Sequence, residues 1–135
     1  MAKLTQEMKD LVAAQQCFIA TVNPDGTPDI GPKRSTRVLD DEHLAFNEVT
    51  AKQTWSNVER GSVVAIAVVD REKLKGFRFV GTAEPITSGP LYDQAVEMMA
   101  KAGLKAPLKA VVKVKVDRIF NLGLPGAGEE IKGLD

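Results

Sequence analysis

Short segments with the residue pattern of β-strands recur along this chain, and turn residues separate them. The clearest is Cys17–Val22, after which Asn23-Pro24-Asp25-Gly26 offers Pro for the first central position of a turn and Gly for a left-handed one. Together the segments predict about six strands, joined mostly by short antiparallel links. Such a pattern favours a small closed barrel or a sandwich over an alternating βαβ fold.

The other expected strands are residues 28–39, 43–47, 62–69, 77–86 and 110–117. Residues 62–69 are almost continuously apolar, so we expect this strand to be buried on both faces. Gly81 interrupts the alternation of residues 77–86 and predicts a bulge or bend there. Residues 110–117 alternate valines with charged residues, which is typical of a strand with one buried face.

Three helices are expected beside these strands. Apolar residues at helical spacing predict an amphipathic helix over residues 5–16, with Thr5 available as its N-cap. A second helix is expected over residues 50–60, and a third begins at Gly89-Pro90 and stops at Gly103. The methionines of the third helix, Met98 and Met99, are expected to fill the core.

Composition limits the possible functions. A chain of 135 residues is expected to form a single domain, and 18 basic against 18 acidic residues leave no global field that would attract nucleic acid or an anionic membrane. We find neither a membrane-spanning stretch nor a secretion signal, so the expected location is the cytoplasm. One cysteine, Cys17, and one distant histidine, His43, are poor material for a metal site. Cys17 is expected in the core and His43 at the surface.

The segment Thr50-Ala51-Lys52-Gln53-Thr54 contains a local conflict. Thr50 as N-cap and Gln53 three residues later would form a capping box that opens the second helix. Lys52 would then lie in the first turn, where the helix dipole disfavours a cation. A bound phosphate would remove the conflict, because the threonine hydroxyls, the free N–H groups and the ammonium could all converge on it. The alternative is a capped helix whose lysine points into solvent.

A second polar segment, residues 33–37 (KRSTR), lies inside the expected strand 28–39. Strand alternation places cations on both faces, so at least one would face the barrel or its mouth. The alternative is an edge strand that carries charge to prevent aggregation. Taken together, the two basic, hydroxyl-rich segments could surround a phosphate, while apolar strands beside them offer a wall for a flat ring. This combination indicates a phosphorylated aromatic cofactor.

Residues 23–39, 44–70 and 77–93, in this order, resemble the pyridoxamine 5′-phosphate oxidase-like flavin mononucleotide (FMN)-binding split barrels, in particular the short flavoredoxin-like members. The resemblance spans nearly the whole chain. It implies a mainly β fold, a six-stranded antiparallel Greek-key split β-barrel with flanking short helices, in a homodimer with FMN sites across the interface.

The resemblance also assigns candidate FMN-binding residues. Those that would hold the phosphate are Lys33, Arg34, Ser35, Thr36, Thr50, Lys52, Gln53 and Thr54. Backbone just before the second helix would line the flavin, which nominates Asn47 and Val49. The partner's C-terminal tail would cover the ring through Leu124 and Pro125.

Two departures from the family pattern bear on activity. The C-terminal Arg and His pair that grips substrate in true pyridoxamine phosphate oxidases is missing after Arg118, so that activity is not expected. The frequent Arg-Lys at the helix start is Ala51-Lys52 here, so Arg34 or Lys33 would have to supply the second cation. The resemblance leaves two functions open: an FMN-dependent oxidoreductase or electron carrier with a small-molecule or protein redox partner, or a non-catalytic flavin-binding, storage or redox-sensing module. Haem or a deazaflavin fits less well, since His43 is the only imidazole available to haem and the phosphate of FMN suits the Lys52 site.

Overall fold

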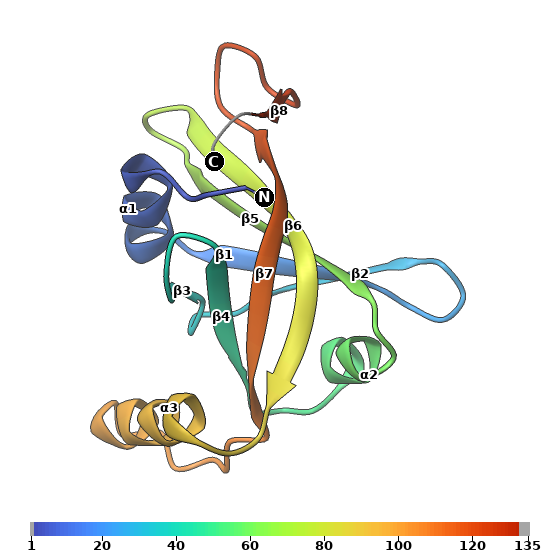
Figure 1. Ribbon diagram of the computed structural model, residues 1–135, viewed down its shortest axis with the longest axis vertical. Helices are drawn as coiled ribbons and strands as arrows, with labels where there is room; N and C mark the ends of the chain where they lie inside the picture. The colour runs from blue at the N-terminus through green and yellow to red at the C-terminus, as the bar shows by residue number, and fades with distance from the viewer. Residues whose placement is uncertain (1, 133–135) are drawn as a thin grey trace.

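One curled antiparallel sheet organises the computed structural model, which describes residues 2–132 (Figure 1). The strands are β1 Cys17–Val22, β2 Pro28–Pro32, β3 Arg37–Val38, β4 His43–Glu48, β5 Val63–Asp70, β6 Lys75–Ile86, β7 Ala110–Asn121 and β8 Glu130–Ile131. Their order is β2-β1-β5-β6-β7-β4-β3, with β8 paired to β7. Within the described residues no ladder joins β2 to β3, so the sheet is an open half-barrel. The sheet is therefore not the closed barrel that the strand pattern allowed beside a sandwich, and the expected six strands are wrong, whereas the mainly β antiparallel class is confirmed.

Three short helices flank the sheet: α1 Gln6–Ala14, α2 Gln53–Glu59 and α3 Pro90–Lys101. The predicted cap of α1 is present, because the Thr5 hydroxyl accepts a hydrogen bond from the Met8 N–H at 3.3 Å. Helices α2 and α3 lie at one end of the sheet, and β8 lies at the opposite end (Figure 1). Among the residues that the structure describes, no helix is long and apolar enough to cross a membrane.

The main core lies on the inner face of the sheet, under α1 and α2. Its largest fully buried side chains include Phe46, Phe79 and Ile66, which come from three different strands. Cys17 belongs to this core as predicted, and burial raises the pKa of its thiol to about 11. The thiol is consequently protonated at neutral pH, which makes it unreactive.

A smaller cluster lies under α3, where Met99 packs with residues of β4 and β7. Met98 does not join it: this side chain is 46% exposed, so its predicted place in the core is wrong. The helix turns its Met99 side toward the sheet, and Met98, one position earlier, points elsewhere.

Strand β5 is buried on one face only, contrary to expectation. Val64, Ile66 and Val68 point into the core, whereas Val63 and Val69 are about half exposed, at 53% and 50%. The exposed side of β5 continues across β1 and β2. We call this surface the outer apolar face; it consists of Phe18, Ala20, Val22, Ile30, Val63, Ala65, Ala67 and Val69.

The predicted bulge of β6 is confirmed. The register between β6 and β7 shifts at Val80/Gly81. A Cβ atom at Gly81 would lie 1.9 Å from the Lys115 carbonyl oxygen, so the close approach of the two strands requires glycine.

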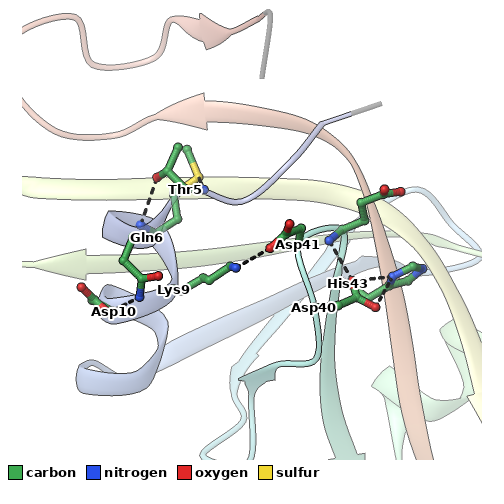
Figure 2. Close-up of polar contacts among 9 residues, drawn as sticks. Thr5, Gln6, Lys9, Asp10, Asp40, Asp41 and His43 are labelled. Atoms are coloured by element: carbon green, nitrogen blue, oxygen red, sulfur yellow. Dashed lines mark hydrogen bonds and ion pairs between the residues drawn. The ribbon is translucent and has the colours of Figure 1, made fainter. Parts of the chain in front are cut away.

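Polar contacts join α1 to the turn between β3 and β4 (Figure 2). Lys9 forms an ion pair with Asp41 in this turn. The His43 Nδ1 lies 2.8 Å from Asp40 Oδ1, and the histidine side chain is 22% exposed. His43 is thus partly buried at the start of β4, a less exposed position than the sequence suggested, and it lies at the opposite end of this strand from Glu48.

Candidate functional site

The segment 33–36 is a turn and not part of a strand, which corrects the predicted strand over residues 28–39. Strand β2 ends at Pro32, one residue before the Lys33 N–H donates a last hydrogen bond to the Cys17 carbonyl at 3.2 Å, and β3 begins only at Arg37. Within the turn the Thr36 N–H and hydroxyl both donate to the Lys33 carbonyl, at 3.1 and 2.7 Å. The cations of this segment are therefore placed by turn geometry and not by strand alternation.

Side-chain hydrogen bonds attach this turn to the end of β4. The Asn47 N–H donates to Ser35 Oγ at 2.8 Å. The half-buried Arg37 donates to the Ser35 carbonyl at 2.9 Å and to Asn47 Oδ1 at 3.2 Å. Burial lowers the pKa of Arg37 below its usual value. The basic segment is in this way fixed against the strand that leads to the second candidate segment.

Glu48, the last residue of β4, connects the two segments. Its carboxylate oxygens lie 3.2 and 3.1 Å from the Lys33 ammonium. The same carboxylate accepts the Ala51 N–H at 3.1 Å and a long hydrogen bond of 3.5 Å from the Thr50 hydroxyl. The side chain of Glu48 is only 1% exposed and that of Lys33 is 18% exposed, so this ion pair is largely removed from water.

The predicted capping box at the start of α2 is wrong. The helix begins at Gln53, its N-cap is Lys52, and no side chain caps it. Thr50 and Ala51 turn back toward the Glu48 carboxylate, and Ala51 has a positive φ of 53°, so the helical conformation starts later than the sequence suggested. Gln53 instead donates to Asn57 Oδ1 at 3.0 Å, one turn along the helix.

Two adjacent pockets open around these segments, and Thr50 lines both. The larger, of about 380 Å³, has a polar side and an apolar side. Its lining consists of Pro32, Lys33, Arg34, Ser35, Asn47, Val49 and Thr50, with Met98, Met99, Ala102 and Leu104 opposite. The smaller, of about 190 Å³, is lined by Asp29, Ile30, Gly31, Glu48, Thr50, Lys52, Gln53 and Thr54. The larger volume falls in the range of about 300 to 1,000 Å³ that is usual for small-molecule sites.

The charges at the two pockets are partly paired. Lys33 is neutralised by Glu48, and Asp29 accepts a hydrogen bond from the Thr54 hydroxyl at 3.1 Å. Arg34 and Lys52 are exposed, and their side chains form no hydrogen bond or ion pair with any other residue that the structure describes. These two cations are therefore available to an anionic ligand.

The structure brings most of the predicted site residues together. All of those from the turn, the end of β4 and the start of α2 line one pocket or the other, except Thr36, which is buried and bonded to its own turn. Leu124 and Pro125 belong to the segment that joins β7 to β8, and Figure 1 shows this segment at the end of the sheet opposite to α2 and α3. There the Leu124 N–H donates to the Leu74 carbonyl at 3.0 Å. Within one chain these two residues do not contribute to the pockets.

Sequence reasoning expected the apolar wall from neighbouring strands, and it missed both the wall that α3 and the residues after it supply and the buried carboxylate. Met98, Ala102 and Leu104 form the wall, and Leu104 is 58% exposed. The sequence signal for this wall was that α3 and the residues after it carry more apolar side chains than one buried helical stripe needs. Assigning all of these side chains to the core conceals that surplus. Glu48 gave a weaker signal, an acidic residue two positions after the apolar run Leu-Ala-Phe.

Known proteins match both the sequence and the fold. The pyridoxamine 5′-phosphate oxidase family matches residues 4–123, and the chain belongs to this family. An uncharacterized protein of Methanocaldococcus jannaschii is 32% identical over 97% of this chain and 89% of its own length. The crystal structure of HupZ from Group A Streptococcus is 46% identical, with a TM-score of 0.84 over 96% of this chain and 99% of that one. An FMN-binding protein of Syntrophomonas wolfei, at 18% identity, shares the fold alone, with a TM-score of 0.71 over 87% of this chain and 84% of that one.

Proposed function

We propose that this protein binds FMN in the two adjacent pockets and works as a flavin-dependent oxidoreductase or electron carrier. The observation that carries the proposal is that two polar segments, residues 33–36 and 50–54, meet beside an apolar wall. A ligand with a phosphate at one end and a flat apolar ring at the other needs this combination. Membership of the pyridoxamine 5′-phosphate oxidase family and the shared fold of an FMN-binding protein support the same ligand.

The residues present fit the phosphate of FMN. This group carries close to two negative charges at neutral pH. Arg34 and Lys52 supply two cations whose side chains have no described partner. The Thr50 hydroxyl, whose hydrogen bond to Glu48 is long at 3.5 Å, can supply a donor, whereas the Thr54 hydroxyl would first have to leave Asp29. Ser35 and Thr36 hold the turn that carries Arg34, and Gln53 is the first residue of α2, next to Lys52.

The larger pocket suits the ring. Met98, Ala102, Leu104 and Val49 offer apolar contact, which keeps water from a bound flavin, and Asn47 lies on the polar side of this pocket. The bound flavin supplies the redox chemistry, and the protein binds, orients and shields it. Cys17 lies in the core and is protonated at neutral pH, so this chain's only thiol takes no part. A storage or redox-sensing role would use the same pockets without turnover.

We further propose that the protein works as a homodimer. The outer apolar face leaves Ile30, Val63 and Val69 at least half exposed, and contiguous apolar surface of this kind is typical of protein interfaces. Leu124 is 60% exposed, and the segment between β7 and β8 that carries it lies at the end of the sheet remote from α2 and α3 (Figure 1), so only a second chain could bring this leucine and Pro125 over a flavin. A symmetric dimer would do so twice.

The first test is direct binding. Purified protein mixed with FMN is expected to show the two visible bands of oxidised flavin, with about one FMN bound per chain after equilibrium dialysis, because each chain carries one pair of pockets. Riboflavin is expected to bind more weakly, since it lacks the phosphate. No FMN binding at micromolar concentration would overturn the proposed function.

A second test separates phosphate binding from ring binding. Lys52→Ala is expected to weaken FMN by about 1.5 to 3 kcal/mol, as removal of a charge-assisted contact does. The affinity for riboflavin is expected to stay the same. Isothermal titration of both ligands measures this difference, and Lys73→Ala, in the turn between β5 and β6, is the matched control. Equal losses for the two ligands would show that Lys52 does not contact the phosphate.

A further inference from the structure

Glu48 is the one charged side chain that is fully buried among the residues that the structure describes. An isolated carboxylate in such a place is costly, so its partners must supply positive charge and hydrogen-bond donors. They are the Lys33 ammonium, the Ala51 N–H and, at the longer distance of 3.5 Å, the Thr50 hydroxyl. An ammonium, a backbone amide and a hydroxyl that converge on one point are the kind of donor set that binds anions.

This donor set comes from the two segments that the sequence indicates as phosphate-binding. In the structure, the carboxylate of Glu48 already accepts hydrogen bonds from these donors. A ligand phosphate that approached Lys33 would meet the Glu48 carboxylate at the same ammonium, and like charges at contact distance repel each other. Arg34 and Lys52 are free of this competition within the described residues, and each lines a pocket.

We propose that Glu48 is an internal counter-anion that sets the phosphate affinity of this site. Its charge neutralises Lys33 and holds the Thr50–Ala51 backbone in place, so that the ligand's phosphate contacts Lys52 and Arg34 but not Lys33. The inference rests on the proposed function, in which the two pockets bind a phosphorylated ligand. It makes Glu48 a positioning residue that also limits how tightly the phosphate is held.

The test is Glu48→Gln, which keeps the shape of the side chain and an oxygen that can accept the Ala51 N–H but removes the charge. Lys33 is then free to contact the ligand, so FMN is expected to bind about tenfold more tightly, since a charge-assisted hydrogen bond is worth at least that factor. Its affinity is also expected to depend more steeply on salt. Riboflavin is expected to bind as to the wild type.

The matched control is Glu72→Gln, which removes an exposed carboxylate in the turn between β5 and β6, at the other end of the sheet. This variant is expected to bind both ligands as the wild type does. Weaker or unchanged FMN binding by folded Glu48→Gln protein would overturn the proposal, because the carboxylate would then increase the affinity for the phosphate or have no effect on it.

A double variant identifies the source of the gain. Adding Lys33→Met to Glu48→Gln removes both charges. Replacing a whole buried ion pair destabilises a protein far less than removing one partner does. The double variant therefore tests the proposal even where Glu48→Gln fails to fold. It is expected to bind FMN within about twofold of the wild type, since Lys33 does not contact the phosphate there. A loss of tenfold or more would show that Lys33 is a direct phosphate ligand and would overturn the proposal.

Inorganic phosphate gives a readout that does not depend on flavin. Phosphate is expected to raise the melting temperature of Glu48→Gln more than that of the wild type or Glu72→Gln, because a ligand that binds only the folded state stabilises it. If the wild type binds no FMN but this shift is present, the proposed function fails and the role of Glu48 stands. Equal shifts in all three proteins would overturn the role of Glu48.

Discussion

Lys33→Met is expected to lower the free energy of unfolding by about 3 kcal/mol. The substitution leaves the Glu48 carboxylate, 1% exposed, without its ammonium partner, and an uncompensated buried charge is among the most destabilising changes in a protein. The remaining donors, the Ala51 N–H and the distant Thr50 hydroxyl, carry no full charge. Denaturant unfolding of the flavin-free protein at neutral pH measures the difference.

Lys52→Met is the matched control for this effect. Lys52 is exposed and its side chain forms no hydrogen bond or ion pair with a described residue, so its removal is expected to change the unfolding free energy by less than about 0.5 kcal/mol. The two substitutions are therefore expected to separate two roles, with Lys33 supporting the fold and Lys52 serving the ligand that we propose. Equal destabilisation by both substitutions would show that the ion pair of Lys33 and Glu48 contributes no more to the free energy of unfolding than an exposed, unpaired lysine does.

Local signals in the sequence predicted much of the sheet. Cys17–Val22 is a strand with the predicted bounds, and Asn23 to Thr27 form the expected turn, in which the Gly26 N–H donates to the Asn23 carbonyl at 2.9 Å. The residues 110–117 start the longer strand β7, whose valines alternate inward as predicted. These elements depend on neighbours in the sequence, so pattern and turn chemistry are enough to locate them.

The errors at the candidate site have a common physical cause. The capping box at Thr50 and Gln53 was plausible from sequence alone, but the Glu48 carboxylate takes the Ala51 N–H and engages Thr50. Glu48 itself is held by Lys33, fifteen residues earlier in the chain. Contacts between separate segments override local propensity here, and a single sequence gives no sign of them. That the two basic segments lie together was predictable, because one precedes β3 and the other follows β4, and antiparallel pairing of these two strands brings those ends side by side.

The apolar run 62–69 led to a different kind of error. The sequence predicted burial on both faces of this strand, and the single chain buries only one. A second copy packed on the outer apolar face would cover the other, so the continuous apolar pattern of β5 is what a dimer requires. In the dimer that we propose, the pattern would match a strand covered on both faces, whereas one chain alone leaves Val63 and Val69 half exposed.

Ala65→Lys is expected to dissociate the dimer that we propose. Ala65 lies in the middle of the outer apolar face, where Ala20 of β1 and Val80 of β6 are its neighbours across the sheet. A symmetric interface would bury two such lysines, each without a counter-charge, and burying unpaired charge costs several kcal/mol. Each monomer is expected to keep its fold, because a lysine on the outer side of a sheet can point into solvent.

Sedimentation at micromolar concentration distinguishes the two states, with a mass of two chains expected for the wild type and of one chain for Ala65→Lys. Ala100→Lys, the same substitution at an exposed position of α3, is the control and is expected to remain a dimer. If FMN sites lie across the interface, Ala65→Lys loses FMN affinity together with its partner chain. A wild-type protein that sediments as one chain, or an Ala65→Lys variant that stays dimeric, would show that the outer apolar face is not the interface.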